Sequence, residues 1–503
     1  MSWPYDHDRP GNEIKTKDAD NPATTSFAWD IMAPRWAMMD TVIGGTESMR
    51  RASLTYMPAH DAESPISYRN RLSTAVMLNV TEITLKTLAG RPFSEPMKRK
   101  DDIPEPVSAL FEDVDLLGSN LDSFCRNWFM DALAKGFSHV LVDFPMLDQP
   151  VGRTRTLEDD RIQQVRPYLV LVPPENIIFA EMTLINGKET LTHLRIREQE
   201  KVRHGYAEKI VDRIRIMEPG RVQVFENTKE KPNDKDKWIL IAEWETSLSY
   251  IPLVTFYTNR VDFMISKPPL VDLAYLNVRH WQSSSDQANI LTVARFPMLA
   301  CSGVSDEQGI IKVGPNQILT TADNQGKFYY VEHTGAAIAA GREDVRDLEA
   351  QMSSYGAEYL KAQPDRNTAT ARTLDSAESL SPLQAMVVQF QDSVSTVLGY
   401  IADWLNIDAP PGHIEIDTGF NLDQATQWEI QTLAAARLSR DISREAFLTE
   451  LKRRRILGQD YDIEADEEEL QEEMATGLVG SGLDLNPGAT NPAVDLPPEP
   501  KKE

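Results

Sequence analysis

The chain has 503 residues, of which 41% are apolar and 26% are charged, and its formal net charge is −25. This length allows two to four domains or one large interlocked body, and the composition is that of a folded soluble protein. The charge argues against a protein that grips nucleic acid through a basic surface, because such domains bind phosphates with Lys and Arg. It does not exclude a protein that encloses DNA and must slide along it.

No apolar run reaches the roughly 18–20 residues that a bilayer span needs, so we expect no membrane association. The first residues, MSWPYDHDRPGNEIK, are polar and lack an apolar signal region, so we expect no secretory signal. Cys125 and Cys301 are the two cysteines, and both lie in apolar contexts. We interpret them as buried thiols in a reducing compartment rather than as a disulfide or a reactive pair.

The N-terminal region begins with a polar segment, 1–25, that is rich in Pro, Gly and Asp and predicts an irregular arm. Between 64 and 93 apolar residues recur every three or four positions, which predicts one helix ending at Gly90 before Pro92. The apolar face of this helix is expected to consist of Leu72, Val76, Val80 and Ile83.

A second amphipathic helix is predicted at 119–136, with Gly136 after its last turn. Its apolar stripe consists of Leu121, Phe124, Cys125, Trp128 and Ala132. A β-branched run at 139–145 predicts a buried strand. From 165 to 258 strand-length segments alternate with turn residues, which predicts an antiparallel meander and an α+β N-terminal half.

A long helix is predicted at 267–296, opened by Pro268 and Pro269. Its apolar stripe is weak and consists of Leu270, Ala274, Trp281, Ala288 and Leu291. Three short strands are predicted between 297 and 333, and helix resumes near 342–362. A small β module is therefore expected between two helices.

A polar loop, AQPDRNTATARTLDS at 362–376, leads into the most regular apolar pattern of the chain. The pattern alternates steps of three and four over three heptads: Leu380, Leu383, Val387, Phe390, Val394, Val397, Ile401 and Trp404. Ser381, Pro382 and Gln384 fit a capping box, at which a helix starts or kinks. Beyond it we expect a strand at 413–420, two helices at 423–439 and 443–455, and a disordered tail from about 476.

No motif for catalysis stands out. NGKET at 186–190 lacks the upstream glycine of a P-loop, and no G-x-S-x-G, H-E-x-x-H or C-x-x-C occurs. The eight histidines are scattered singly, and we interpret His139 and His280 as packing or hydrogen-bonding residues. We therefore expect a non-enzyme with no catalytic residues and no cofactor.

The segment 413–417 contains three residue types that can bind a metal ion. His413, Glu415 and Asp417 would share one side of a strand, because alternate residues face the same way. The sequence offers no further ligand to complete the set, so we expect no metal site.

The order of these parts resembles that of tailed-bacteriophage portal proteins, the head-to-tail connector family. NTATARTLDSAESLSPLQAMVVQFQDSV (367–394) is similar to the family's segment before the long helix beside the tunnel, and ISREAFLTELKRRRILGQDYDIEADEEELQEE (442–473) to its C-terminal pattern. PPLVDLAYLNVRHW leading to FPMLACSG, and AKGFSHVLVDFP, are similar too. The resemblance covers roughly residues 65–475.

The resemblance implies a ring of twelve copies with the portal fold: α+β, with a wing, a helical stem, a small β clip, a long kinked tunnel/wing helix and an α-helical crown. The implied segments are an N-terminal arm at 1–25, wing at 26–267, first stem helix at 268–296, clip at 297–340, second stem helix at 341–362, tunnel loop at 363–373, long wing helix and returning strand at 374–423, crown at 424–475 and disordered tail at 476–503.

Two sets of site residues follow from the same resemblance. The DNA-facing tunnel loop would present Gln363, Asp365, Arg366, Asn367, Thr368, Thr370 and Arg372. The turns of the clip would bind a partner through Ser305, Asp306, Glu307, Gln308, Asp323, Asn324, Gln325 and Lys327.

The implied function is a channel at one capsid vertex of a virion, assembled in the bacterial cytoplasm, for DNA packaging and ejection. Its implied partners are further copies of itself, double-stranded DNA bound without sequence specificity, the terminase large subunit, a head-completion adaptor, and the major capsid and scaffold proteins. One alternative is another oligomeric virion or scaffold protein that does not conduct DNA. The other is an enzyme whose active site is not visible as a motif.

Overall fold

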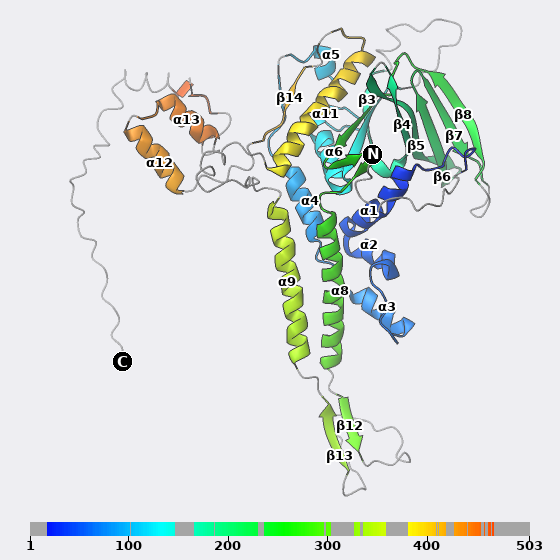
Figure 1. Ribbon diagram of the computed structural model, residues 1–503, viewed down its shortest axis with the longest axis vertical. Coiled ribbons are helices and arrows are strands. Elements are labelled where there is room, and N and C mark those ends of the chain that lie inside the picture. The colour runs from blue at the N-terminus through cyan, green and yellow to red at the C-terminus, as the bar shows by residue number, and fades with distance from the viewer. Residues whose placement is uncertain are drawn as a thin grey trace. The chain divides into compact units, whose positions relative to one another are not determined.

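The computed structural model describes residues 18–100, 102–145, 165–185, 187–229, 236–295, 298–302, 326–331, 335–358, 381–408, 410, 412–418, 427–439, 441–453, 457, 461–463 and 465–466. The chain divides into two units, Met1–Thr418 and Gly419–Glu503, and each is described by itself. The first unit mixes helices with sheets, which confirms the predicted α+β class (Figure 1).

The first unit begins with four helices and one short 3-10 turn: α1 (Phe27–Ile43), α2 (Gly45–Ala52), η2 (Ser53–Thr55), α3 (Pro65–Thr74) and α4 (Val80–Gly90). α1 begins after Ser26, whose side chain accepts a hydrogen bond from the Trp29 backbone N–H. α3 begins in the same way after Ser64 and has Pro65 in its first turn.

The single helix predicted at 64–93 is wrong, because residues 75–79 are not helical. Asn79 ends this break by accepting a hydrogen bond from the Glu82 backbone N–H, which starts α4. The Asn79 amide also donates to the carbonyls of Val42 and Ile43 at the end of α1. This tertiary contact therefore interrupts a segment whose apolar periodicity predicts a single helix.

The apolar face predicted for 64–93 is wrong as well. Val76 and Ile83 are 66% and 60% exposed. α4 instead buries Thr81, Leu85, Leu88 and Ala89. The exposed positions recur at helical spacing but are not the side that packs on the protein core.

α6 (Leu121–Lys135) confirms the second predicted helix, and every residue of its predicted stripe is buried. Gly136 ends it with φ at 93°, a left-handed conformation that favours glycine. A Cβ at this position would lie 2.6 Å from the Ser266 Oγ, so space also excludes a larger residue. The chain passes directly from α6 into β2 (Phe137–Asp143), the predicted buried strand.

The two larger sheets of this unit are antiparallel, with the orders β3-β2-β9 and β4-β5-β6-β7-β8. Their remaining strands are β3 (Tyr168–Val172), β4 (Ile177–Ile185), β5 (Lys188–His204), β6 (Ala207–Glu218), β7 (Arg221–Asn227), β8 (Trp238–Glu245) and β9 (Leu253–Tyr257). The meander predicted for 165–258 is confirmed from β4 to β8, whereas β3 and β9 pair with β2 in the other sheet. α1 packs on both sheets through a cluster that includes Trp36, Leu141 and Ile196.

α11 (Pro382–Trp404) confirms the helix predicted from the three-heptad apolar pattern. We call that row of apolar residues the seam and α11 the seamed helix. Ser381 and Gln384 form both hydrogen bonds of the capping box. The seam residues from Leu383 to Ile401 are buried, whereas Leu380 lies outside the described residues. Phe390 is fully buried and meets four other rings: Phe93, Trp128, Phe129 and Phe256.

The remaining elements of the body are short: β1 (Lys98–Arg99), α5 (Glu105–Ser108), η3 (Pro174–Asn176), β10 (Arg260–Asp262), β11 (Ile265–Ser266) and β14 (Ile414–Glu415). β10 and β11 pair with each other in a separate two-stranded sheet. β14 pairs antiparallel with β1, and it is shorter than the strand predicted at 413–420.

Two long helices, α8 (Val271–Ala294) and α9 (Ala336–Glu358), lie side by side (Figure 1). The chain between them contains β12 (Met298–Ser302) and β13 (Lys327–Val331), which pair antiparallel. α9 begins at Ala336, five residues before the predicted 341. The second of the three predicted strands lies outside the described residues.

The second unit contains α12 (Gln427–Leu438) and α13 (Arg444–Arg453), which contact each other. They confirm the two short helices predicted after 423. An ion pair between Arg444 and Asp466 connects the start of α13 to the chain that follows it.

Candidate functional site: the arm formed by α8 and α9

The arm, as we name α8 and α9 with the intervening β12 and β13, is the most distinctive part of the first unit. α8 has 24 residues, which corresponds to a length of about 36 Å. Its first half is anchored in the body, because Leu273, Asn277 and Trp281 are buried. Asn277 accepts hydrogen bonds from the backbone N–H and hydroxyl of Thr81 in α4.

Polar contacts hold α9 against α8 along their length. Arg279 lies 3.4 Å from Asp344, and His280 lies 3.4 Å from Glu349. The Gln287 amide donates a 3.0 Å hydrogen bond to the carbonyl of Ile338, at the start of α9. Because this start lies beside the second half of α8, the two helices run antiparallel and β12 and β13 follow at one end of the pair.

The side chains of α9 that face α8 become smaller toward the end that carries β12 and β13. Leu348 and Met352 are buried against the anchored half of α8. Further along, a Cβ on Gly341 would lie 2.2 Å from the Gln287 Oε1, so glycine allows the helices to approach. The remaining surface of both helices is mostly exposed beyond Asp286 and before Asp344. Among the residues that the structure describes, this part of the arm is covered on one side only.

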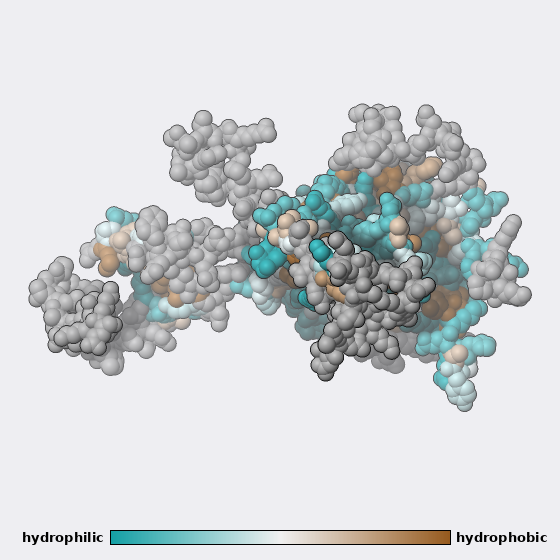
Figure 2. Space-filling model, turned by 90° about the horizontal axis from the view of Figure 1, so that it is seen from below, coloured by the Kyte–Doolittle hydropathy of each residue, from teal (hydrophilic) through white to brown (hydrophobic). Residues whose placement is uncertain are grey.

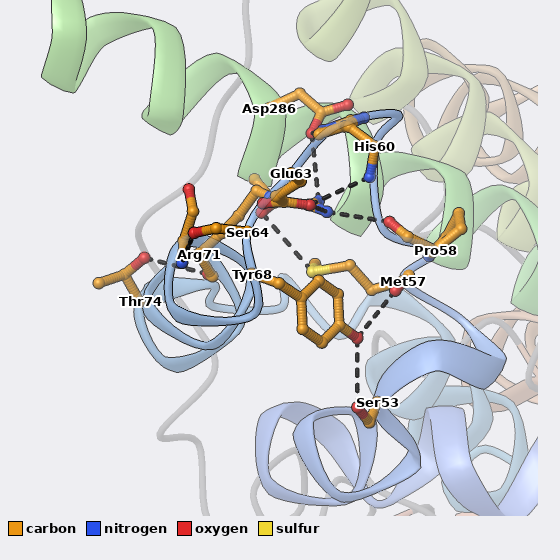
Figure 3. A network of polar contacts seen from close by, with 12 residues as sticks. Ser53, Met57, Pro58, His60, Glu63, Ser64, Tyr68, Arg71, Thr74 and Asp286 are labelled. Atoms are coloured by element: carbon orange, nitrogen blue, oxygen red, sulfur yellow. Dashed lines mark hydrogen bonds and ion pairs between the residues drawn. The ribbon is translucent and has the colours of Figure 1, made fainter.

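A polar network braces α8 from another side (Figure 3). The Arg71 guanidinium on α3 bonds both carboxylate oxygens of Glu63, at 2.9 and 2.8 Å, and lies 3.4 Å from Asp286 on α8. It also donates to the carbonyl of Pro58. Arg71 is the only residue of α3 that is fully buried. This Arg71–Glu63–Asp286 network, which we call the clamp, therefore attaches α3 to α8.

Arg71 also sets the ionisation of its partner. Its hydrogen bonds lower the pKa of the Glu63 carboxyl from 4.5 to about 2, and a bond from the His60 backbone N–H adds to the effect. The Glu63 side chain is almost completely buried, so little solvent weakens the pair.

The clamp predicts a pH dependence of α3. Because Glu63 is more acidic in the folded chain, its contribution to stability is fully present above pH 4.5 and is lost as the pH falls toward 2. Hydrogen exchange in α3, corrected for intrinsic rates, should therefore accelerate across this window in the wild type. Glu63→Gln should lack that step because its side chain does not ionise, and parallel profiles for the two proteins would contradict the assignment.

The predicted clip residues are largely outside the described part of the chain. Ser305, Asp306, Glu307, Gln308, Asp323, Asn324 and Gln325 all belong to the range 303–325, which the structure does not describe. Lys327 is described: it begins β13, pairs in register with Ser302 and is exposed. The exposed Lys327 is therefore the only one of these residues whose position can be compared with the prediction.

The predicted tunnel loop also lies outside the described residues. Gln363, Asp365, Arg366, Asn367, Thr368, Thr370 and Arg372 all fall within 359–380. The structure describes the helices on both sides, α9 up to Glu358 and α11 from Pro382. The loop's role remains an expectation from the resemblance.

The isolated titratable residues behave as packing groups. His139 is buried, bonds the Thr255 hydroxyl at 2.8 Å, and has its pKa lowered to about 3 by burial. His280 is buried and faces Glu349. Both predictions for these histidines are confirmed.

His413, Glu415 and Asp417 do not form a metal site among the described residues. The ring of His413 bonds Asp102 at 2.7 Å, and no group of three or more His, Cys, Asp or Glu in the described chain is placed to hold a metal ion. Cys125 is a buried free thiol, as predicted, and burial raises its pKa. The side chain of Cys301 lies outside the described set. Of the helices described, none is long and apolar enough to cross a membrane.

Sequence reasoning missed the clamp altogether. Glu63 and Asp286 are 223 positions apart, and Arg71 precedes a residue of the apolar face that was predicted for 64–93. No local pattern distinguishes Arg71 from exposed arginines such as Arg69. Only the packing of α3 on α8 buries one and exposes the other.

Residues 269–405 match a protein family described as a domain of unknown function, DUF4055. The match begins two residues before α8 and ends one residue after α11, so it spans the arm and the seamed helix. It covers less than half of the chain. No match was found among curated proteins.

Several solved structures resemble the chain at low identity. A chain from the neck of a native gene transfer agent (GTA) particle, computed with C12 symmetry, is 11% identical with a TM-score of 0.37, over 74% of this chain and 89% of that one. A chain from the neck of the empty particle, computed with C6 symmetry, is 11% identical with a TM-score of 0.36, over 78% and 91%. A chain from the native virion is 10% identical with a TM-score of 0.34, over 78% and 89%. Similarities at this level carry no argument about function.

Proposed function

We propose that this chain is a portal protein of a tailed-phage-like virion. In this proposal, twelve copies form a ring at one capsid vertex, and the channel of the ring passes double-stranded DNA during packaging and ejection. The arm would be the stem of the ring, and β12 with β13 would belong to the clip. The body with its two sheets would form the wing, and α12 with α13 would belong to the crown.

The observation that carries the proposal is the construction of the arm. Two antiparallel helices leave the body, one about 36 Å long, and carry a small β module where they end. Their apolar contacts are concentrated near the body, and their far halves are exposed on most sides. Helices with so little apolar cover are typical of elements that pack on neighbouring copies and also face water.

The net charge of the chain favours a protein that lets DNA pass over one that binds DNA tightly. The formal net charge of −25 would make the ring strongly negative, which disfavours tight binding of DNA. On α9 itself five residues are acidic and two are basic. A repulsive surface suits sliding, with a few polar side chains of the tunnel loop as local contacts.

The proposed partners follow from this role. The clip would contact the terminase large subunit during packaging and a head-completion adaptor later, while the wing would meet the major capsid and scaffold proteins. ATP would be hydrolysed by the separate motor, so we propose that the chain has no catalytic activity.

Mass photometry of the purified protein tests the proposal. We expect closed particles of about twelve subunits, seen as rings with a central hole by negative-stain electron microscopy. A protein that remains a monomer or dimer at every concentration would contradict the proposal. That result would favour a virion or scaffold protein that does not enclose DNA.

A further inference from the structure

α3 is a helix with an uncovered outer face. It has ten residues, of which only Arg71 is fully buried, and it is attached to α8 by the clamp. Ile66, Arg69, Asn70 and Ser73 share the side away from Arg71, and all four are exposed. Ile66 is 65% exposed, and Leu54 in the neighbouring η2 is 62% exposed. A short helix gains most of its stability from packing, so this face is expected to be covered in the assembled protein.

The arm has a second uncovered face, on α9. Gly341, Val345, Leu348 and Met352 follow each other at steps of four and three and face α8. On the opposite side a row at the same spacing consists of Ala336, Ala340, Glu343, Asp347, Ala350 and Ser354. All six residues of this outer row are exposed. Small residues in such a row allow another helix to approach closely.

The two faces carry opposite charge. Glu343 and Asp347 are one turn apart on the outer row, and like charges at this spacing destabilise a helix unless a cation lies nearby. Neither carboxylate makes an ion pair within the described chain. On α3 the exposed cation is Arg69, whose Nε donates to the carbonyl of Pro65 in its own helix and to no other group among the residues described. Arg69 and Ile66 therefore match the carboxylates and alanines of the outer row.

α8 separates these two faces. Arg279, His280 and Gln287 contact α9 from α8. The segment containing η2 and α3 is contacted by other α8 residues: Gln282, Ser285 and Asp286. Figure 1 shows α3 and α9 on different sides of α8. One chain therefore cannot join its own α3 face to its own outer row without dismantling the arm.

The geometry points to a second copy as the occupant: the outer face of α3 on one chain packs against the outer row of α9 on the next. The contact joins two different surfaces, so it repeats from copy to copy and can close into a ring. That the repeated copies close into a ring rests on the proposed function. The assignment of the contact to α3 and α9 goes beyond that function. Figure 2 shows apolar patches separated by hydrophilic residues on the described surface seen from below.

Charge reversal with rescue tests the contact. Arg69→Glu would place like charges at every interface, and Glu343→Arg with Asp347→Arg would do the same from the other side. Each should raise the concentration for half-assembly by more than about tenfold in mass photometry. The triple variant restores opposite charges and should assemble within about threefold of the wild type. Arg203→Glu, an exposed reversal on β5, is the matched control and should have no effect.

The outcomes separate the two proposals. Rings that form equally well with Arg69→Glu and Arg203→Glu would overturn this contact and leave the portal proposal standing. A triple variant no better than the single-sided reversals would also overturn it, because a folding defect is not rescued by a second reversal. Open oligomers that Arg69→Glu disperses and the triple variant restores would support the contact while contradicting the ring. A wild type that never associates would overturn both.

Discussion

Phe390→Ala should lower the free energy of unfolding of the first unit by about 3–5 kcal/mol. Phe390 is fully buried in α11, and its ring centre lies 4.8 Å from that of Trp128 and 4.9 Å from that of Phe256. These partners come from α6 and β9, so the ring joins three elements far apart in sequence. Alanine would remove the apolar contacts and leave a cavity that surrounding rings fill only partly.

Urea unfolding followed by tryptophan fluorescence measures this loss. Val388→Ala is the matched control on the same helix, because Val388 is 40% exposed and its truncation should change stability by no more than about 0.5 kcal/mol. Phe390→Leu should fall between the two, since it keeps part of the buried volume. Equal midpoints for Phe390→Ala and Val388→Ala would show that the aromatic cluster does not hold α11 on the body.

Arg71→Ala should destabilise the attachment of α3 to α8 by about 3–5 kcal/mol, because it leaves the buried Glu63 carboxylate without its partner. Hydrogen exchange of the α3 backbone amides measures the free energy of this local opening directly. Arg51→Ala is the control: Arg51 pairs with Glu47 on α2, and its side chain is 73% exposed. Its loss should cost no more than about 0.5 kcal/mol.

A double variant separates the ion pair from packing. Arg71→Met with Glu63→Met replaces both charges by apolar side chains, a change that is often neutral for buried pairs. We expect its α3 exchange to stay near that of the wild type and well below that of Arg71→Ala. If Arg71→Ala and Arg51→Ala have the same small effect, the clamp does not hold α3.

Two helices were predictable because their signals are local. α6 has a continuous apolar stripe and a glycine after its last turn, and α11 has a capping box followed by three heptads. In each case one short segment contains both the end signal and the apolar face. The meander from β4 to β8 was predictable for a similar reason, since its strands are consecutive and pair with their neighbours, unlike β3 and β9.

The region from 64 to 93 was not predictable in this way. Its apolar residues recur at helical spacing, yet Asn79 bonds the end of α1 and divides the segment. Val76 and Ile83 then remain exposed while Arg71 is buried. Which side of a short helix is buried depends on the element packed against it, and no pattern within α3 identifies α8 as that element.

The α+β class, the consecutive strands from β4 to β8, the two long helices around a small β module and the helix α11 could all be inferred from the sequence alone. These properties depend on periodicity, caps and turn residues within short segments. The clamp, the aromatic cluster around Phe390 and the uncovered faces of α3 and α9 became visible only in the folded chain. They arise between residues tens to hundreds of positions apart, where burial and charge pairing depend on how the helices pack.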